Sequence, residues 1–337
     1  MPKNVTIKDI AAEAGVSIAL VSFVMNNRIE ADGKQKYRVN ENTRQRILEV
    51  ARRLNYQPNS AARTLRRGRS LVIGAILSDI SNVFYGEIAR QLEEVAFKQG
   101  YTVLFGSSDE SPEKFDKIMH SFIDRGVEGF VIVPCEGSEK SLRYIMNVGI
   151  PFVIIDRKDM DIPAPKIVLD NEEAMSKAVS VLADKGIRNI EMISYTMRVS
   201  SISGRESGFI EGMKSLGLEK EDIKIHRLRF EHIIEDTDTV IPDIVKRNVD
   251  GLVFATNALA IAGIKKLTSM GIQVQKDIHL VGFDDSDAYD LFNPPIPHIS
   301  QPIDKICKES FVLLKKLMDN EMPQESVLVT LAGRIVQ

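Results

Sequence analysis

The sequence predicts a small all-α N-terminal domain with helix-turn-helix geometry, followed by an α/β core of two Rossmann-like subdomains. Residues 5–26 show two short helical patterns around a four-residue Ala-Gly-Val-Ser turn at 14–17. From residue 70, apolar runs of strand length alternate with amphipathic helical stretches, which is typical of parallel sheets covered on both faces. The chain has 337 residues, which suits two or three domains.

The charge distribution separates the same two regions. The first 70 residues hold 14 Lys and Arg against 6 Asp and Glu, a net charge of +8, whereas the remainder carries −11. A basic N-terminal region on an acidic body favours a polyanion as the partner of that region.

The N-terminal region reads as three helices. Thr6 can cap the first helix with Asp9 three residues later, and Gly15 can end it because glycine adopts a positive φ at little cost. Ser17 can cap the second helix, and the third begins near Asn40. The inward stripe of the second helix is Val21, Val24 and Met25, and its outward positions are Ala19, Ser22, Phe23 and Asn26, with Ile18 at the edge.

Residues 55–70 read as a linker. Pro58 suits a helix start, and the next residues can form about two turns. Because so short a helix is unstable alone in water, we expect this segment to fold only when held against something.

The core pattern contains more strands than one compact sheet needs, so two α/β subdomains are expected, dividing near Pro163–Lys166. Helical stretches such as Phe84–Gln99 and Glu172–Lys185 lie between strands. The predicted strands are Leu71–Leu77, Thr102–Gly106, Gly129–Val133, Phe152–Asp156, Ile167–Asp170, Ile190–Ser194, Gly251–Ala255, His279–Phe283 and, last, Ser326–Leu331.

Several function classes are excluded by what the sequence lacks. No apolar run spans a bilayer and no secretory h-region begins the chain, so we expect a cytoplasmic protein with no membrane contact. The cysteines Cys135 and Cys307 read as buried thiols, with no metal and no cofactor expected. We do not expect an enzyme, because no GxSxG, Walker, GxGxxG or HExxH motif occurs. A transport binding protein is disfavoured by the missing export signal and by the helical N-terminal region.

The chain resembles the LacI/GalR family of bacterial transcription regulators in an ordered set of motifs that covers nearly its whole length. The motifs are TIKDIAAEAGVS (6–17), VSFVMNN (21–27), QPNSAARTL (57–65), PFVIIDR (151–157), LDN (169–171), GRESGF (204–209), GLVFATN (251–257) and VGFDD (281–285). The resemblance implies a helix-turn-helix headpiece, a hinge helix and a two-lobed core like that of periplasmic binding proteins. It also implies a homodimer that reads a pseudo-palindromic double-stranded operator.

The resemblance sets the expected domain boundaries. The DNA-binding domain is expected at 1–57, the hinge helix and linker at 58–69, and the effector-binding and dimerisation core at 70–337. Within the core, the N-subdomain is expected at about 70–163 and 296–322, and the C-subdomain at about 164–295 and 323–337.

The DNA-contacting residues follow from the family motifs. The second helix is implied to lie in the major groove, with Ile18, Ala19 and Phe23 at base-reading positions and Leu20 beside them. Phosphate-contacting positions, which set register without reading sequence, match Thr6, Ser17, Ser22 and Asn26. In the hinge, Leu65 matches a residue that relatives wedge into the minor groove, Ala62 a groove-floor contact, and Asn59 and Arg63 backbone or groove contacts. The alternative for Leu65 is a hydrophobic linker residue.

This chain departs from its relatives at the DNA end. Ile18, Ala19, Leu20 and Phe23 offer no side-chain hydrogen bonds to bases, so they either touch thymine methyls or leave specificity to DNA shape; alternatively, Leu20 and Phe23 pack on neighbouring protein. The link at 28–39 is longer than usual and contains Lys34, Lys36, Tyr37 and Arg38. It either grips phosphates, in which case removing the three basic side chains flattens the salt dependence of binding, or is a surface insertion.

The effector residues are expected at the carboxyl ends of core strands, between the two lobes. Asp, Asn and Arg suit the hydroxyl groups of a small carbohydrate, and Phe84 or Tyr85 can stack on a sugar face or pack in the core. Arg205 and Asp284 match effector positions, or form a structural interlobe salt bridge. The expected set is Asp79, Phe84, Tyr85, Asp156, Arg205, Asn257, Asp284 and Gln301.

One departure leaves the ligand class open. Relatives often carry Asn-Asp where this chain has Asn257-Ala258, and Arg157, Arg198 and Arg205 can favour an acidic or phosphorylated sugar. The sequence does not give the sign of regulation; the resemblance implies a repressor released by its effector as the commoner mode in the family, with corepression and activation as alternatives. No heptad-bearing tail follows the last strand, so a dimer is expected rather than a coiled-coil tetramer, with the helix at Phe84–Gln99 as candidate interface.

Overall fold

The computed structural model describes residues 5–25, 39–56 and 68–337. The chain divides into two compact units, Met1–Ser70 and Leu71–Gln337, and each is described by itself. The predicted fold class is confirmed: helices only in the described part of the first unit, and an α/β architecture in the second.

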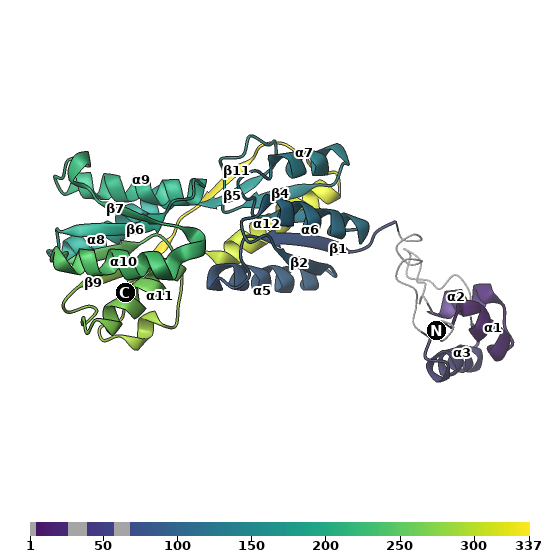
Figure 1. Cartoon of the computed structure of the whole chain (residues 1–337). Coiled ribbons are helices and arrows are strands. Elements are labelled where there is room, and N and C mark those ends of the chain that lie inside the picture. The colour runs from purple at the N-terminus through teal and green to yellow at the C-terminus, as the bar shows by residue number, and fades with distance from the viewer. Residues whose placement is uncertain (1–4, 26–38, 57–67) are drawn as a thin grey trace. The chain divides into compact units, whose positions relative to one another are not determined.

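The first unit contains α1 (Ile7–Ala14), α2 (Ile18–Met25) and α3 (Glu41–Arg53) (Figure 1). The carboxylate of Asp9 accepts hydrogen bonds from the backbone N–H of Thr6 at 2.8 Å and from its hydroxyl at 2.7 Å, which caps α1. Gly15 ends α1 with a φ of 61°, and Ser17 Oγ accepts from the N–H of Leu20 at 3.2 Å. The three helices enclose one small core of buried residues: Ile10, Ala11, Ala14, Val21, Val24, Ile47, Val50 and Ala51.

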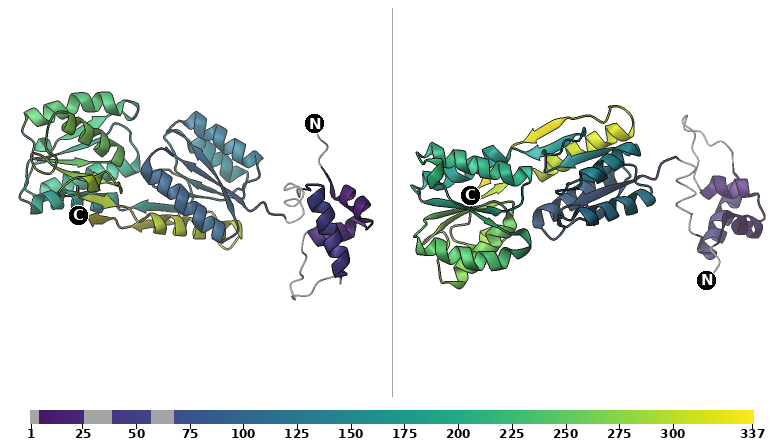
Figure 2. Two further views of the ribbon diagram at one scale, coloured as in Figure 1. Left: turned by 90° about the horizontal axis from the view of Figure 1, so that it is seen from below. Right: turned by 45° about the horizontal axis from the view of Figure 1, so that its top comes forward.

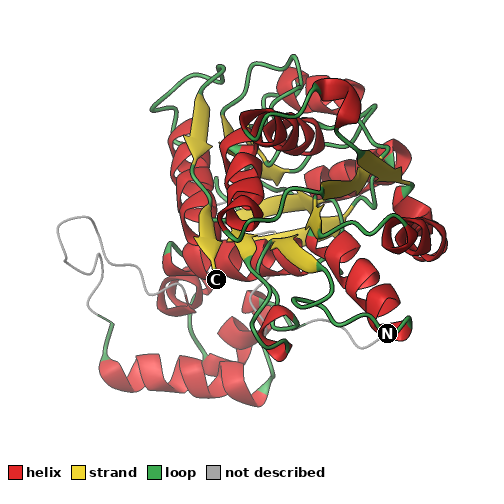
Figure 3. Ribbon diagram, turned by 90° about the vertical axis from the view of Figure 1, so that its left-hand side faces the viewer, coloured by secondary structure: helices red, strands yellow, loops and turns green. Residues whose placement is uncertain are grey.

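The first lobe of the core is built on a six-stranded sheet with helices on both faces (Figure 1), whereas Figure 3 shows the molecule from the end of the second lobe. All its pairings are parallel. The strand order is β11 (Leu328–Leu331), β5 (Lys166–Leu169), β4 (Phe152–Ile155), β3 (Phe130–Ile132), β1 (Val72–Leu77) and β2 (Thr102–Ser107). Alternate residues of β1 face opposite sides, so Ile73, Ala75 and Leu77 pack against α5 (Val83–Lys98) and α12 (Ile303–Met318). Ile76 packs on the other side with α6 (Pro112–Asp124) and α7 (Glu139–Asn147).

The second lobe repeats this design with a second six-stranded sheet. The strand order is β12 (Arg334–Val336), β10 (His298–Ser300), β9 (His279–Phe283), β8 (Gly251–Phe254), β6 (Ile190–Tyr195) and β7 (Ile225–Leu228), with β12 antiparallel. The helices α8 (Asn171–Asp184) and α9 (Ser200–Ser215) pack together, as do α10 (Ile233–Lys246) and α11 (Asn257–Ser269) (Figure 1). Short 3-10 turns occur at Lys220–Asp222, Phe230–His232 and Tyr289–Leu291.

The chain passes between the two sheets three times: near Asp170, at 301–302 and at 332–333. The three crossovers lie together, because a Cβ on Gly333 would sit 3.1 Å from Ile299 and 3.5 Å from Leu169. Figure 2 shows the last part of the chain, in yellow, running through both lobes. The two lobes are therefore joined by three neighbouring crossover segments.

The sheet pairing differs from the expected subdomain boundaries. A division at 163 places β5 in the second lobe, whereas β5 pairs with β4 in the first; likewise β11 belongs to the first lobe and β10 to the second. The sequence does not reveal this, because an apolar strand carries no mark of the sheet it joins. Three strands were not predicted: β7, whose apolar run is broken by His226 and Arg227, and β10 and β12, which span three residues each.

Candidate functional site

The exposed face of α2 is the candidate nucleic-acid interface. Ile18 is 45% exposed and Ala19 is also exposed, so both are available to a partner. Leu20 and Phe23 are half-buried and pack against the core of their own unit, which favours the packing interpretation for these two. The predicted contacts Asn26, Asn59, Ala62, Arg63 and Leu65 and the loop residues Lys34, Lys36, Tyr37 and Arg38 lie outside the described residues.

The second candidate site is a cleft between the lobes. In parallel sheets the carboxyl ends of the strands meet at one edge, and the residues that follow β1, β4 and β9 accordingly meet here. Of the expected effector residues, seven line the cleft: Asp79, Phe84, Tyr85, Asp156, Arg205, Asp284 and Gln301. Asn257 is the exception, since it is buried at the start of α11 and its amide donates to Tyr289 Oη at 3.3 Å.

Other lining residues were not in the expected set. Glu110 follows β2 and Tyr195 ends β6, so the same strand-end rule would have found both. Ser201, at the start of α9, and Phe230, in a short turn, carry no comparable signal in the sequence. The full lining adds Ser78, Asn82, Arg157, Met197, Val199, Ile202 and Thr256.

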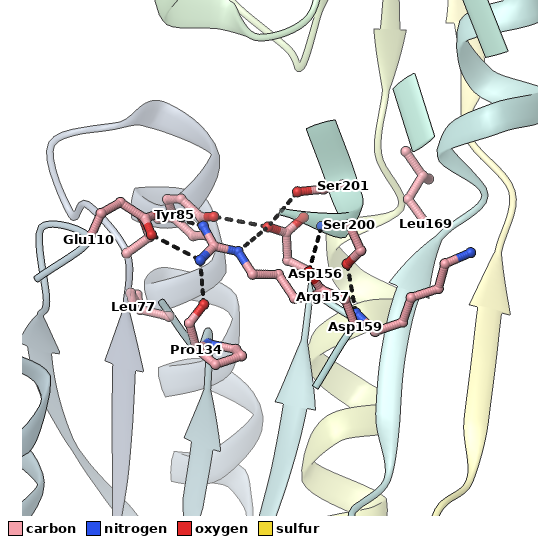
Figure 4. Close-up of polar contacts among 12 residues, drawn as sticks. Leu77, Tyr85, Glu110, Pro134, Asp156, Arg157, Asp159, Leu169, Ser200 and Ser201 are labelled. Carbon is pink, nitrogen blue, oxygen red and sulfur yellow. Dashed lines mark hydrogen bonds and ion pairs between the residues drawn. The ribbon is translucent and has the colours of Figure 1, made fainter. Parts of the chain in front are cut away.

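A buried polar network occupies the first-lobe wall of the cleft (Figure 4). Tyr85 Oη donates to Asp156 Oδ2 at 3.0 Å, and burial together with the charge of Asp156 raises the pKa of Tyr85, so its hydroxyl stays protonated. Arg157 Nη1 donates to Glu110 Oε2 at 2.9 Å, and Nη2 donates to the other carboxylate oxygen. Nη1 also donates to the carbonyl of Pro134. Tyr85 and Phe84 thus belong both to the first-lobe core and to the cleft.

Arg205 anchors the second-lobe wall. Its Nε donates to Asn171 Oδ1 at 2.8 Å and its Nη1 to the carbonyl of Ala255 at 2.7 Å, while the guanidinium lies 3.7 Å from the ring centroid of Phe283. Close approach of α9 to α8 makes this reach possible, because a Cβ on Gly208 would sit 2.2 Å from the carbonyl oxygen of Glu172. The GRESGF motif thereby places its arginine in the cleft.

Asp284 lies in the same lobe as Arg205, so these two residues cannot form the interlobe salt bridge given above as an alternative. Asp284 accepts a hydrogen bond from Gln301 Nε2 at 2.7 Å, and burial raises its pKa above the ordinary value despite the nearby charge of Arg205. Asp156 and Asp284 have φ values of 67° and 64°. Asp tolerates this left-handed region better than most residues. At both positions the chain changes direction directly after the strand, beside the cleft.

Direct contacts hold the two lobes together beside the cleft (Figure 4). The N–H of Lys158, after β4, donates to Ser200 Oγ at 2.8 Å, and the N–H of Ser200 donates to Asp159 Oδ2 at 3.1 Å. Ser201 Oγ also donates to Asp156 Oδ2 at 3.5 Å. The start of α9 is therefore hydrogen-bonded to the segment after β4.

Arg198, predicted with Arg157 and Arg205 to favour an acidic sugar, does not line the cleft. Arg198 is exposed and lines a neighbouring hollow with Arg227 and Glu206, which pair with each other at 2.6 Å. In the described parts of the chain, no group of three or more His, Cys, Asp or Glu could hold a metal ion. None of the helices there is long and apolar enough to cross a bilayer.

Comparison with known proteins gives a consistent result. Residues 6–59 match the family model "Bacterial regulatory proteins, lacI family", and residues 179–337 match a periplasmic binding protein-like domain. HTH-type transcriptional regulator DegA of Bacillus subtilis is 30% identical over 308 residues, covering 90% of this chain and 88% of the relative. Catabolite control protein A of Priestia megaterium is 27% identical over 328 residues, covering 96% of each chain. The crystal structure of the Lac repressor dimer bound to operator and the anti-inducer ONPF matches with a TM-score of 0.82 and 21% identity, over 99% of this chain and 98% of that one.

Proposed function

Because the chain belongs to the lacI family of bacterial regulatory proteins, it is a DNA-binding transcriptional regulator, and we propose that it is a repressor controlled by a carbohydrate bound in the interlobe cleft. The observation that carries this proposal is the cleft itself, in which strand-end carboxylates, two arginines and aromatic rings converge from both lobes. Side chains that accept and donate in pairs, beside aromatic faces, suit sugar hydroxyls and a sugar ring.

At the DNA end, α2 enters the major groove. Ile18 and Ala19 face base edges, and Thr6, Ser17 and Ser22 set the register on phosphates. Leu65, Asn59, Ala62 and Arg63, which match the family's hinge contacts, and Asn26 are assigned as further contacts to the operator. The protein acts in the cytoplasm, where its operator lies, and carries out no catalysis.

The operator-bound form is a homodimer. The helix α5 carries exposed apolar side chains, with Phe97 73% exposed and Val83 48% exposed, and we assign this face to the interface between subunits. A twofold dimer presents two copies of α2 to a pseudo-palindromic site.

Control requires that the effector binds one lobe arrangement better than the other. The contacts between Lys158, Asp159 and Ser200 stabilise the closed arrangement, and a ligand that bridges Asp156 and Asp284 adds to them. Closure changes the spacing of the two hinges in the dimer, so operator affinity falls, with a coupling of about 1–3 kcal/mol typical of such systems.

The test uses the full-length protein. Its operator is selected from a random duplex pool, and thermal unfolding is measured against a panel of sugars; a ligand specific to the folded state at a hundredfold excess over Kd adds about 2.7 kcal/mol of stability. A sugar that raises the unfolding temperature must also release the selected operator. Corepression or activation would appear as tighter operator binding with the same sugar.

Two arginine variants make the test specific. Arg205→Met should abolish the sugar response and keep operator binding, because Arg205 lines the cleft. Arg198→Met, a matched control in the neighbouring hollow, should leave both unchanged. A sugar response that survives Arg205→Met, or that is lost equally in both variants, contradicts the proposed site.

A further inference from the structure

The guanidinium of Arg157 is already engaged by the protein. It is 3% exposed, its two terminal nitrogens bind the two carboxylate oxygens of Glu110, and Nη1 also binds the carbonyl of Pro134. A forked guanidinium matched to two parallel acceptors is the geometry by which proteins bind carboxylate and phosphate groups of ligands. Here a carboxylate of the chain itself occupies that position.

Glu110 is held in place by its loop. Asp109 and Glu110 both have positive φ values, 50° and 55°, a conformation that costs a non-glycine residue free energy and persists only where its surroundings impose it. Ser78 Oγ donates to the same carboxylate, and Ser107 Oγ donates to Asp109 at 2.6 Å. The loop thus directs the Glu110 side chain towards Arg157.

The remaining charges of the cleft also disfavour an anionic ligand. The lining contains four carboxyl groups, of Asp79, Glu110, Asp156 and Asp284, against two arginines. The second arginine, Arg205, already donates to Asn171 and Ala255. An anionic ligand therefore meets a wall with more carboxyl groups than guanidinium groups, and it reaches the paired nitrogens of Arg157 only by displacing Glu110.

One donor of Arg157 is buried without a hydrogen-bond partner in the described structure. This donor is Nε, and it lies 3.9 Å from Asp156 Oδ2. A ligand hydroxyl in the cleft can donate to the carboxylate of Asp156, which lines the cleft. This contact fits an uncharged polyol.

We propose that Glu110 determines the charge of the effector: by occupying the guanidinium of Arg157, it restricts the cleft to uncharged polyhydroxylated ligands and excludes phosphorylated and carboxylated sugars. The ligand class rests on the proposed function, whereas the role of Glu110 does not. The acidic or phosphorylated sugar kept open by the sequence is thereby set aside.

The first experiment needs no identified effector. Thermal unfolding of the full-length protein is measured in acetate, inorganic phosphate and chloride at equal ionic strength, for the wild type, Glu110→Ala and the milder Glu110→Gln. We expect both variants to lose stability in chloride, because Arg157 is left buried without its partner, and to regain a large part of it in acetate or phosphate. The wild type should gain less stability from acetate or phosphate than either variant, because these anions act on it only through their general effect on folded proteins.

Two further variants locate the effect. In Glu110→Ala combined with Arg157→Met, the recovery by acetate and phosphate should disappear. Glu113→Ala removes an exposed carboxylate close by in the same loop-helix region. The stability of this variant should depend on the anion no more than that of the wild type. Absence of recovery in both Glu110 variants, recovery without Arg157, or equal stabilisation of the wild type would each overturn the proposal.

The second experiment addresses the ligand class. Sugars and their 6-phosphates and acids are compared as matched pairs on the wild type and Glu110→Gln. The wild type should respond to uncharged members only, and the variant should shift the affinity ratio towards anionic members by about tenfold or more, the size of one charge-assisted contact. If anionic members bind the wild type best, the proposal is wrong. If no sugar of either kind binds while operator binding persists, the effector part of the proposed function fails, and the anion recovery still decides the role of Glu110.

Discussion

Gln301 Nε2 donates a hydrogen bond of 2.7 Å to Oδ1 of Asp284, and both side chains are more than nine-tenths buried. Gln301 lies in the second crossover between the lobes, whereas Asp284 follows β9. The bond therefore links a cleft carboxylate to one of the three crossovers between the lobes.

We expect Asp284→Asn to stabilise the protein at neutral pH while removing the sugar response. Burial holds the folded-state pKa of Asp284 above its ordinary value of 3.8, so its ionisation opposes folding. That cost is absent below the ordinary pKa, grows as pH rises through the folded pKa and is full above it. Thermal unfolding between pH 4 and 8 should show the advantage of the variant increasing with pH, since its amide oxygen still accepts from Gln301.

The neighbouring carboxylate gives a control of opposite sign. Although burial opposes ionisation of Asp285, hydrogen bonds with His298 and Ser300 lower its pKa. Asp285→Asn should therefore reduce stability at neutral pH. If the stability of both variants changed with pH in the same way, the buried environment of Asp284 would not be the cause of its unfavourable ionisation.

Gly208→Ala should destabilise the second lobe strongly. The new Cβ would lie 2.2 Å from the backbone oxygen of Glu172, so α9 must move away from α8, at a cost of about 1–3 kcal/mol or more. The movement also separates Arg205 from Asn171. Urea unfolding measures the loss, and Gly86→Ala is the matched helical control, because its nearest neighbour is 3.8 Å away and alanine favours a helix by up to about 1 kcal/mol. Similar results for both would contradict the packing argument.

Glu191 should give the second lobe an acid-sensitive component of stability. Burial opposes its ionisation, but His226 at 2.6 Å and Arg247 at 2.5 Å outweigh burial and lower its pKa below the ordinary 4.5. The contribution is complete above the ordinary pKa and is lost as pH falls through the folded pKa.

Glu191→Gln should therefore cost about 1–3 kcal/mol at pH 7, and the difference from the wild type should shrink below about pH 4.5. Thermal unfolding at pH 3–7 measures it. Glu206→Gln breaks a pair whose Arg227 is 48% exposed and should cost at most about 1 kcal/mol. A difference for Glu191→Gln that does not change with pH would exclude this cause.

On the candidate DNA-binding helix, Ile18 and Phe23 should behave differently. Phe23→Ala should lower headpiece stability by roughly 1–2 kcal/mol, less than the 3–5 of a fully buried Phe, because Phe23 is half-buried against the headpiece core. Ile18→Ala should leave stability within about 0.5 kcal/mol and weaken operator binding relative to nonspecific DNA. Chemical unfolding measures the stability of the headpiece, and fluorescence anisotropy with the selected operator measures DNA affinity. If Ile18→Ala were destabilised like Phe23→Ala, Ile18 would be a packing residue and not a DNA contact.

The sequence predicts strands and helices well where one physical signal dominates. Continuous apolar runs such as Phe152–Asp156 mark buried parallel strands, and glycine at position 15 marks a helix end. Which strands pair with each other depends on residues far apart in the sequence. A local apolar pattern therefore does not assign β5, β10 and β11 to their sheets.

The same limit applies to the cleft. The rule that ligands bind after parallel strands found Asp79, Asp156 and Asp284, since position along the strand is visible in sequence. Whether a side chain faces the cleft or the interior depends on backbone dihedrals and neighbours, which the sequence does not show, so the same rule also predicts Asn257, whose side chain is buried against Tyr289.

The pairing of the last two strands also bears on how the protein is made. The first sheet takes β11 and the second takes β12, both from residues 328–336. Chains emerge from the ribosome N-terminus first and fold domain by domain, so the helical unit at the start can form long before either lobe has its full complement of strands. A chain truncated before residue 328 therefore retains the sequence of the helical unit and lacks one strand of each sheet.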